Sequence, residues 1–426
     1  MVEEKNLTIM KYIRTYETEE KFLTDKDSTS RGFRLKPTLY KYSEAGDHVQ
    51  LELDDPRKHG DSTYMEITLD SDVEFSFYIG NKTGDTQTTM NCSIDWGDGT
   101  VETKTITKDD KGFKLAHSYV AGSYKIELYG VEREYGIPGD TTNSISYISP
   151  LHSSVRRIVL SNSVVDIGES AFNECESLIS VYIPESVTSI GNLAFIGCIS
   201  LTSVHISEGV TSIGKYAFSS CSSLTSIHIP NSVTSLGESA FGSNPSLKSI
   251  YIPESVTNIG RFVVWNCDSL TSFYIPRSMT TLISGMFQKC NALESIYIPE
   301  SITSIGRWCF EGCTSLVSVH IPNSVTSLGY DMFARCTSLP SITIPESVTF
   351  LDEYVFNGCS SLSSISSLNP IAPTLNREHA LPDDEYPDDM FYNLPTNGTL
   401  HIKPGATGYD AWLSLLPSGW TIVEDL

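Results

Sequence analysis

Tyrosine and histidine recur at one position of the sequence, every 23 residues between positions 182 and 320. Exposed side chains of these two types combine a large contact area with polar tips, which suits recognition of protein or glycan surfaces. Three residues further along, a second recurring position is mostly acidic. The first set is Tyr182, His205, His228, Tyr251, Tyr274, Tyr297 and His320, and the acidic rim is Glu185, Glu208, Glu254, Glu300 and Glu346. Both sets indicate binding chemistry rather than catalysis.

These residues belong to a 23-residue unit that repeats nine times over residues 155–361, with LTSIHIPNSVTSLGESAFGSNPS at 224–246 as a clear copy. The segment L-x-x-I-x-I alternates and ends before proline, which predicts a short strand. Copies of a fixed period stack as coils, so these strands should form one parallel sheet. Period-2 geometry then points the tyrosines and histidines away from the core, on a common face.

Two interpretations of this face compete. Aromatic and β-branched residues suit an exposed parallel sheet, and identical neighbours stack, so stability alone could account for the pattern. Seven exposed rings in a row exceed what stability requires, and we therefore favour a binding face. A carbohydrate-active enzyme is a remote alternative, because it needs a carboxylate pair facing a cleft, whereas these glutamates recur along a flat ladder. The sequence has no Walker loop, nucleophile elbow or zinc signature, so we expect no catalytic residue, metal or cofactor.

Other positions of the repeat predict its interior. A recurring phenylalanine should fill each coil, and a recurring glycine should mark a tight bend that needs an unusual backbone angle. The phenylalanines are Phe172, Phe195, Phe218, Phe241, Phe287, Phe310, Phe333 and Phe356, with Val264 in the gap. The glycines are Gly168, Gly191, Gly214, Gly237, Gly260, Gly306 and Gly329. Ile283 and Asp352 replace the glycine in copies six and nine, so we expect local distortion there.

Eight of the ten cysteines occupy one position of the repeat, where Asn244 stands in the fourth copy. They are Cys175, Cys198, Cys221, Cys267, Cys290, Cys313, Cys336 and Cys359. Cysteine and asparagine share small size and some hydrogen-bonding capacity, so we interpret the position as a packed turn with buried, reduced thiols. A disulfide between neighbouring coils is within geometric reach, but nothing selects a pairing.

The repeat pattern I-P-x-S-V-T-S-I-G-x-x-A-F-x-x-C-x-S-L resembles the BspA-type leucine-rich repeat, also called the Treponema-type or LRR_5 repeat. The resemblance implies a curved solenoid with a parallel sheet on its concave side. It also implies a surface protein that binds host or microbial ligands. Residues 362–426 hold a partial repeat, an acidic insertion and a segment similar to the terminal caps of gut Bacteroidetes proteins. We expect the insertion, NREHALPDDEYPDDMFY at 376–392, to be a solvated loop, with a calcium site as the minor alternative.

An antiparallel sandwich is predicted before the repeats. Val73, Phe75, Phe77 and Ile79 alternate with polar residues, and Asp-Gly turns follow. The segments IDWGDGT and HSYVAGSYKIELYG resemble the PKD domain, an immunoglobulin-like module, which implies a spacer rather than a catalyst. A metal or acid–base site at Asp95, Asp98 and His117 is disfavoured, because turn geometry explains the aspartates.

Composition narrows the choice of partners. The chain has 426 residues and a net charge of −23, which argues against nucleic acid and against an anionic membrane surface. The sequence predicts no transmembrane anchor, and the charged first thirty residues lack the apolar core of a signal peptide. The segments MKYIRTYETEEKF and PTLYKY resemble lead segments of virion proteins from phages of gut Bacteroidetes. That similarity implies attachment to a carrier particle and display on a virion, with the bacterial cell surface or an extracellular location as the alternative.

We therefore expect a mainly β protein that acts as a non-enzymatic binding or adhesion protein for a protein or glycan ligand on a cell surface. Residues 1–62 are expected to be an irregular anchoring segment that attaches the protein to a particle or envelope. Residues 63–131 form the PKD-like sandwich, and 132–154 form a linker and a cap for the first coil. Residues 155–361 form nine leucine-rich repeats, and 362–426 complete the chain.

Overall fold

The computed structural model of the chain describes residues 39–42, 48–51, 63–69, 73–79, 89–107, 113–132, 144–148, 155–160, 164–376 and 390–426. The chain divides into two compact units, Met1–Lys58 and His59–Leu426. In the first unit, β1 (Leu39–Tyr42) pairs antiparallel with β2 (His48–Leu51). The remainder of the predicted anchoring segment 1–62 lies outside the described residues, as do residues 377–389 of the acidic insertion.

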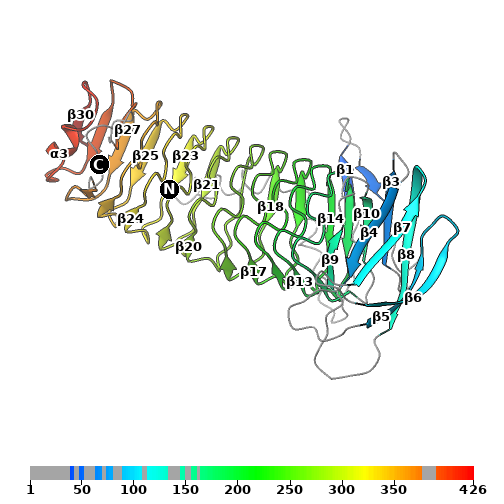
Figure 1. The fold of residues 1–426 in the computed structure, drawn as a ribbon. Coiled ribbons are helices and arrows are strands. Elements are labelled where there is room, and N and C mark those ends of the chain that lie inside the picture. The colour runs from blue at the N-terminus through cyan, green and yellow to red at the C-terminus, as the bar shows by residue number, and fades with distance from the viewer. Residues whose placement is uncertain are drawn as a thin grey trace. The chain divides into compact units, whose positions relative to one another are not determined.

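Six antiparallel strands begin the second unit. They are β3 (Thr63–Leu69), β4 (Val73–Ile79), β5 (Thr89–Asp95), β6 (Val101–Thr107), β7 (Phe113–Tyr119) and β8 (Gly122–Glu132). Strands β3, β8, β5 and β6 are neighbours in one sheet, whereas β4 and β7 pair in another. Figure 1 shows these strands in blue and cyan. The alternating segments are thus antiparallel strands, and their membership of the PKD family stays a prediction.

One strand from each coil except that of copy six forms the first ladder of the repeat region, and Figure 1 shows the coils side by side. Paired strands are parallel and in register, so that Tyr182 lies opposite His205 and Tyr297 opposite His320. Proline ends the strands as predicted, for example Pro184 after Ile183. The strands are β10 (Val155–Val159), β12 (Ser180–Ile183), β14 (Ser203–Ile206), β16 (Ser226–His228), β18 (Ser249–Tyr251), β21 (Ser295–Tyr297), β23 (Ser318–His320), β25 (Ser341–Ile344), β27 (Ser364–Ser367), β29 (Thr399–Ile402) and β30 (Thr421–Glu424).

A second parallel ladder, which the sequence did not reveal, runs through the V-T-S-I segments as two-residue strands. Each contributes one inward apolar side chain, such as Ile190 or Leu236, to the core. The strands are β11 (Asp166–Ile167), β13 (Ser189–Ile190), β15 (Ser212–Ile213), β17 (Ser235–Leu236), β19 (Asn258–Ile259), β20 (Thr281–Leu282), β22 (Ser304–Ile305), β24 (Ser327–Leu328), β26 (Phe350–Leu351) and β28 (Thr374–Leu375). Where both ladders are continuous, as between the coils of β12 and β14, neighbouring coils are held together on two sides.

The antiparallel strands also cover the first coil. Strand β3 pairs antiparallel with β10, and β9 (Ser144–Ile148) lies between β4 and β11. The segment predicted as a cap, 132–154, thus supplies one covering strand through β9, whereas β3 from the antiparallel part supplies the other. Any solenoid must cover its first apolar coil, and here two existing sheets are extended for that purpose.

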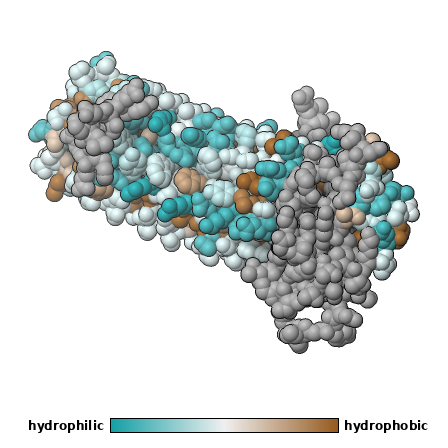
Figure 2. All heavy atoms as spheres, in the orientation of Figure 1, coloured by the Kyte–Doolittle hydropathy of each residue, from teal (hydrophilic) through white to brown (hydrophobic). Residues whose placement is uncertain are grey.

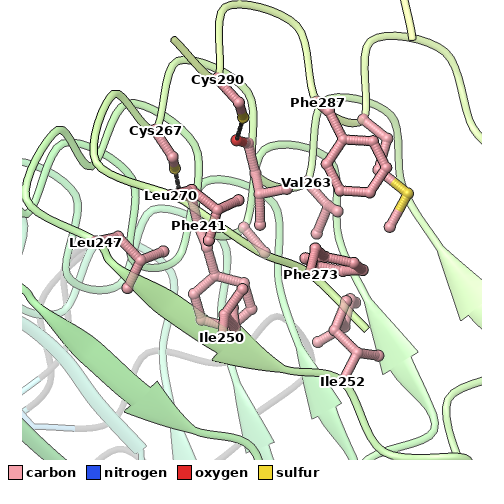
Figure 3. Packing of buried hydrophobic residues seen from close by; sticks show 14 of the residues in the cluster. Phe241, Leu247, Ile250, Ile252, Val263, Cys267, Leu270, Phe273, Phe287 and Cys290 are labelled. Carbon is pink, nitrogen blue, oxygen red and sulfur yellow. Dashed lines mark hydrogen bonds between the residues drawn. The ribbon is translucent and has the colours of Figure 1, made fainter. Parts of the chain in front are cut away.

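Stacked phenylalanine rings form the centre of the solenoid. Phe195 lies 5.0 Å from Phe172 and from Phe218 between ring centroids, and all three are fully buried. At the gap in the column, Val264 is fully buried as predicted. There Phe273, which replaces the usual isoleucine of the strand, packs edge-on against Phe287 at 4.8 Å (Figure 3). The ring of Phe273, which comes from the strand position, therefore lies beside Val264, where the column of phenylalanines lacks a ring.

The expectation that the recurring glycine needs an unusual backbone angle is wrong. These glycines are not among the residues with positive φ. Instead, a Cβ at Gly191, Gly214 or Gly260 would come within 2.3–2.6 Å of backbone atoms of the preceding coil. Glycine is required because successive coils approach closely at this point. Left-handed backbone occurs at two other positions of the repeat, represented by Tyr216 and Ser220.

Local distortion is found in copy six and not in copy nine. In copy six, residues 271–276 form no strand in the first ladder. The second ladder is also interrupted, because β19 and β20 belong to different sheets. In copy nine, the Asp352 N–H donates to Leu328 O at 2.9 Å, the same bond that Gly191 makes to Ile167 at 2.8 Å. A side chain fits in copy nine because the coils have already separated: a Cβ on Gly329 would find its nearest atom at 3.3 Å.

The cysteine position is a hydrogen-bonding site between coils. The nine cysteines whose side chains are described are free and buried, as predicted. The Sγ of Cys221 donates to Phe195 O at 3.2 Å, and that of Cys267 donates to Phe241 O at 3.4 Å (Figure 3). Asn244 makes the same contact, with Nδ2 donating to Phe218 O at 2.9 Å. Burial raises the pKa of the Cys221 thiol to about 12, so the thiols are poorly reactive.

Replacing Asn244 with cysteine should leave stability unchanged or raise it by about 1 kcal/mol. The buried Oδ1 of Asn244 has no hydrogen-bond partner in the described structure, and a thiol removes this atom while keeping the donor. Asn244→Ala should instead lower the free energy of unfolding by about 1–3 kcal/mol, because the donor is lost. Denaturant unfolding of the two variants provides the comparison, and equal losses would contradict this role.

Candidate ligand-binding face

The seven predicted tyrosine and histidine side chains lie on the outer surface of the first ladder, which we call the sheet face. Within each strand they alternate with buried residues, as in the buried–exposed order of β18. Tyr251 and Tyr274 are each 40% exposed, and Tyr297 is 57% exposed. Tyr182 and His205, nearer the antiparallel strands, are half-buried. The structure therefore brings together all seven residues that the sequence selected.

Rings on the sheet face stack along the solenoid. Tyr182 stacks on His205 with ring centroids 4.8 Å apart and planes 9° from parallel. Tyr251 and Tyr274 stack at 5.9 Å and 19°, and Tyr297 and His320 at 6.3 Å and 10°. In these pairs ring faces turn toward each other, so edges and polar tips face the solvent. Burial lowers the pKa of His205 below its ordinary value, and the neighbouring His228 lowers it further, which favours neutral imidazole.

The acidic rim lies beside the column that the seven tyrosine and histidine side chains form on the sheet face. Its five glutamates are exposed. Part of the rim holds neighbouring coils together. Glu208 Oε2 accepts the Ser232 N–H at 3.1 Å, and Glu254 accepts the N–H groups of Arg277 and Ser278 at 3.1 and 3.0 Å. These bonds satisfy turn amides that have no strand partner. The rim is therefore a structural element as well as a source of surface charge.

The tyrosine and histidine column contacts the acidic rim at two points. Tyr274 donates its hydroxyl to Glu254 Oε1 at 2.9 Å, and His320 Nε2 lies 3.8 Å from Glu300 Oε1. Burial raises the pKa of Glu254, but hydrogen bonds from Ser278, Arg277 and Tyr274 outweigh it, so this pKa is lowered overall. The carboxylate therefore stays charged at neutral pH. The arrangement offers aromatic edges, hydroxyls and carboxylates along one line.

The family model for the BspA type leucine-rich repeat region matches residues 146–271 and 280–373, in six copies, which is more than half of the chain. The chain belongs to the BspA type leucine-rich repeat family. The resemblance seen in the repeat sequence is thereby confirmed, whereas the PKD-like and virion-like resemblances fall outside these residues and stay predictions. No curated protein matches the sequence.

Solved structures similar to this BspA type protein are also leucine-rich repeat proteins. One from Bacteroides ovatus is 25% identical, with a TM-score of 0.51, over 68% of this chain and 88% of that one. One from T. pallidum is 30% identical, with a TM-score of 0.39, over 43% and 87% of the two chains. A leucine-rich cell surface protein from Faecalibacterium prausnitzii is 25% identical, with a TM-score of 0.37, over 61% and 82%.

A second group of aromatic residues, which the sequence analysis missed, lies on the turn side of the BspA type coils. Trp308 is T-shaped to Tyr330 at 6.0 Å, and Tyr330 to Tyr354 at 5.4 Å. Phe262 stacks on Trp308 at 6.4 Å and contacts Trp265 at 6.3 Å. Three of the five occupy the position two residues before the core phenylalanine or its substitute. Because serine, leucine, glycine and aspartate share that position in other copies, no recurring residue type marked it.

Carboxylates are buried beside these aromatic residues. Glu311 is 7% exposed and accepts hydrogen bonds from Gln288 and Arg335. Burial, and then the negative charge of Glu311, raises the pKa of Asp331 to about 6. Arg335 and a hydrogen bond from Trp308 act in the opposite direction. Asp331 therefore destabilises the folded protein whenever it is charged.

Replacing Asp331 with asparagine should raise the free energy of unfolding at pH 7 by about 1 kcal/mol, after allowance for solvent screening. The carboxyl group binds its proton more tightly in the folded state, with a pKa of about 6 against an ordinary 3.8. Its unfavourable contribution therefore disappears as the pH falls from above 6 towards 4. Chemical denaturation at pH 7 and pH 5 should show the advantage of the variant shrinking at pH 5, and an advantage independent of pH would contradict this assignment.

Asp95 and Asp98 lie at the turn after β5, and His117 of β7 contacts Asp98. Asp95 Oδ1 accepts the Gly97 N–H at 2.8 Å, and Asp98 Oδ1 accepts the Thr100 N–H at 2.9 Å. His117 Nε2 lies 2.8 Å from Asp98 Oδ2, and its ring stacks on Trp96. Turn geometry therefore explains Asp95 and one oxygen of Asp98, as predicted, whereas the other oxygen of Asp98 contacts His117.

Within the part of the chain that the structure describes, no group of three or more histidine, cysteine, aspartate or glutamate side chains is arranged to hold a metal ion. No helix in the same residues is long and apolar enough to span a bilayer. The acidic residues proposed for a calcium site in the minor alternative, Glu378, Asp383, Asp384, Glu385, Asp388 and Asp389, lie outside the described residues.

Proposed function

We propose that this chain is a non-enzymatic binding protein that presents the sheet face to ligands on host or microbial surfaces. The supporting observation is the column of seven tyrosine and histidine side chains on successive coils. Three pairs of them are in register on neighbouring strands, and Tyr251, Tyr274 and Tyr297 are exposed. On the side of the solenoid seen in Figure 2, hydrophilic residues predominate and hydrophobic ones are scattered. Recognition through polar tips suits such a surface better than burial of a continuous apolar patch.

Catalysis is the weaker proposal for the same face. Glycoside hydrolysis uses two carboxyl groups on opposite sides of the scissile bond. The acidic rim places one exposed carboxylate per coil in a line along the stack, and Glu208 and Glu254 accept backbone hydrogen bonds there. Such an arrangement supports binding of an extended ligand.

The test is a triple substitution, Y251S/Y274S/Y297S. It should abolish binding of the purified protein to its target cells while leaving the unfolding midpoint within a few degrees, because these side chains are exposed. A control with the same loss of tyrosines on the turn side, Y330S/Y354S/Y392S, should bind as the parent does. Unchanged binding by the first variant, or equal loss in both, would contradict the assignment of the sheet face.

Display at a surface follows from this proposal. The similarity of the first segment to virion proteins favours a phage particle, with the bacterial cell surface as the alternative. A relative described as a cell surface protein is consistent with the alternative. Fractionation of particles and cells with an antibody to the protein separates the two. Deletion of residues 1–62 should release the protein from its carrier, and retention would place the attachment elsewhere.

A further inference from the structure

We propose that the ligand of the sheet face is an extended polypeptide with a lysine or arginine at every third residue. This inference rests on the proposed function of that face and names the chemistry of its partner. Three observations carry it: the stacking of the rings, the connection of their polar tips to carboxylates, and the spacing of the acidic rim.

The ring stacking disfavours a neutral glycan. Sugar rings bind aromatic side chains mainly through the ring faces. In the Tyr182–His205 and Tyr251–Tyr274 pairs, the planes lie 9° and 19° from parallel at centroid distances of 4.8 and 5.9 Å. One face of each ring in a pair is therefore covered by its neighbour, and edges, hydroxyls and imidazole nitrogens make up much of what the solvent meets. The exposed hydroxyl and imidazole groups suit hydrogen bonding to a polar polypeptide.

The polar tips lead to negative charge. Tyr274 donates to Glu254, and His320 lies 3.8 Å from Glu300. A hydroxyl that donates to a carboxylate presents its oxygen as an acceptor. The face is therefore rich in acceptors and carries exposed carboxylates, which complements a cationic partner that donates hydrogen bonds.

The rim has a period of two coils. From copy three to copy nine, glutamate alternates with other residues in the order Glu208, Asn231, Glu254, Arg277, Glu300, Asn323 and Glu346, and all seven are exposed. Neighbouring coils of a parallel ladder lie about 4.8 Å apart, so successive glutamates are about 10 Å apart along the stack. The single arginine between them should repel cationic side chains that are out of phase.

A ligand must match this spacing of about 10 Å. A polyproline II helix turns once in three residues and rises about 9 Å per turn, so every third side chain points the same way. A β-strand repeats its side-chain direction after about 7 Å, which drifts out of phase with the glutamates. The match therefore selects a chain with a basic residue at every third position.

The experiment uses the full chain and synthetic peptides. The probe is a dodecamer that repeats Lys-Pro-Pro four times, and its control is a dodecamer of the same composition with the four lysines consecutive. Fluorescence anisotropy should show binding of the first peptide at least tenfold tighter than the second, weakening as salt is added. Equal affinity for both peptides would overturn the spacing argument, and preferential binding of a neutral oligosaccharide would overturn the choice of polypeptide.

Charge-matched variants locate the interaction. The substitution E208Q/E254Q/E300Q keeps acceptors for the backbone bonds but removes three rim charges, and it should weaken binding of the spaced peptide at least tenfold. The variant E169Q/E174Q/E176Q removes three exposed charges from the first copy, away from the rim, and should bind as the parent does. If both variants lose affinity for the spaced peptide equally, the effect depends only on net charge, and the proposed site on the rim is wrong. If the tyrosine variant loses cell binding while the peptides fail to bind, the proposed function stands and this inference falls.

Discussion

Replacing Phe218 with alanine should lower the free energy of unfolding by about 3–5 kcal/mol. The side chain is fully buried, and its ring lies between those of Phe195 and Phe241, at 5.0 and 5.8 Å. The neighbouring coils are held to this one by the ladder pairs β12–β14, β13–β15 and β15–β17, so they cannot collapse into the space and the cavity remains. Denaturant unfolding followed by circular dichroism measures the loss.

The control for this substitution is Phe350→Ala. Phe350 lies on the short strand β26 with its side chain 36% exposed, so its loss leaves no closed cavity. We expect a change below about 1 kcal/mol for this variant. A repeat protein can also lose cooperativity when one coil is weakened, so the Phe218 variant should broaden or split the transition. Similar losses at both positions would mean that the ring column does not stabilise the solenoid.

Replacing Gly237 with alanine should cost about 3 kcal/mol or more, because the new methyl group overlaps main chain. A Cβ there would lie 2.4 Å from the carbonyl carbon of Gly214 and from the nitrogen of Lys215. Backbone atoms inside a ladder cannot move aside as the end of a flexible side chain can. The two coils must separate, which strains the ladder bonds between β15 and β17.

The same substitution at Gly329 is its control. There the nearest atom to a new Cβ is Ile305 O at 3.3 Å, and the backbone is not left-handed. Alanine also restricts the unfolded chain, which contributes about 0.4–1 kcal/mol in favour of folding where the native backbone accepts it. Gly329→Ala should therefore be close to neutral or slightly stabilising. Thermal unfolding that ranks the two variants in the reverse order would disprove the close-approach explanation.

The repeat could be predicted in detail because its period fixes which residues contact each other. Strand, inward leucine, phenylalanine column and outward tyrosines all follow from positions that recur every 23 residues. The glycine was misinterpreted because a left-handed angle and a close approach select the same residue type. Only coordinates distinguish Gly237, which touches backbone, from Gly197, whose φ is +72°.

Features that do not recur were not predictable in this way. The pairing of β3 with β10 joins segments about ninety residues apart and leaves no periodic trace. The aromatic residues around Trp308 lie on coils five to nine, but serine, leucine, glycine or aspartate stands at the position of Trp308 in several other copies. On the sheet face, the sequence identified which residues emerge together. It did not show that their rings stack in pairs, so that one face of each ring in a pair is covered by its neighbour.

The hydrogen bonds between coils join residues 22 to 26 positions apart, as in Ser186 to Val164, Thr211 to Thr188 and Cys221 to Phe195. Removing or duplicating one complete unit of the gene would restore each of these partnerships across the new join. An insertion of any other length would shift every partner beyond it. Recombination can therefore lengthen or shorten this solenoid in whole steps only, and each step adds or removes one side chain on the sheet face.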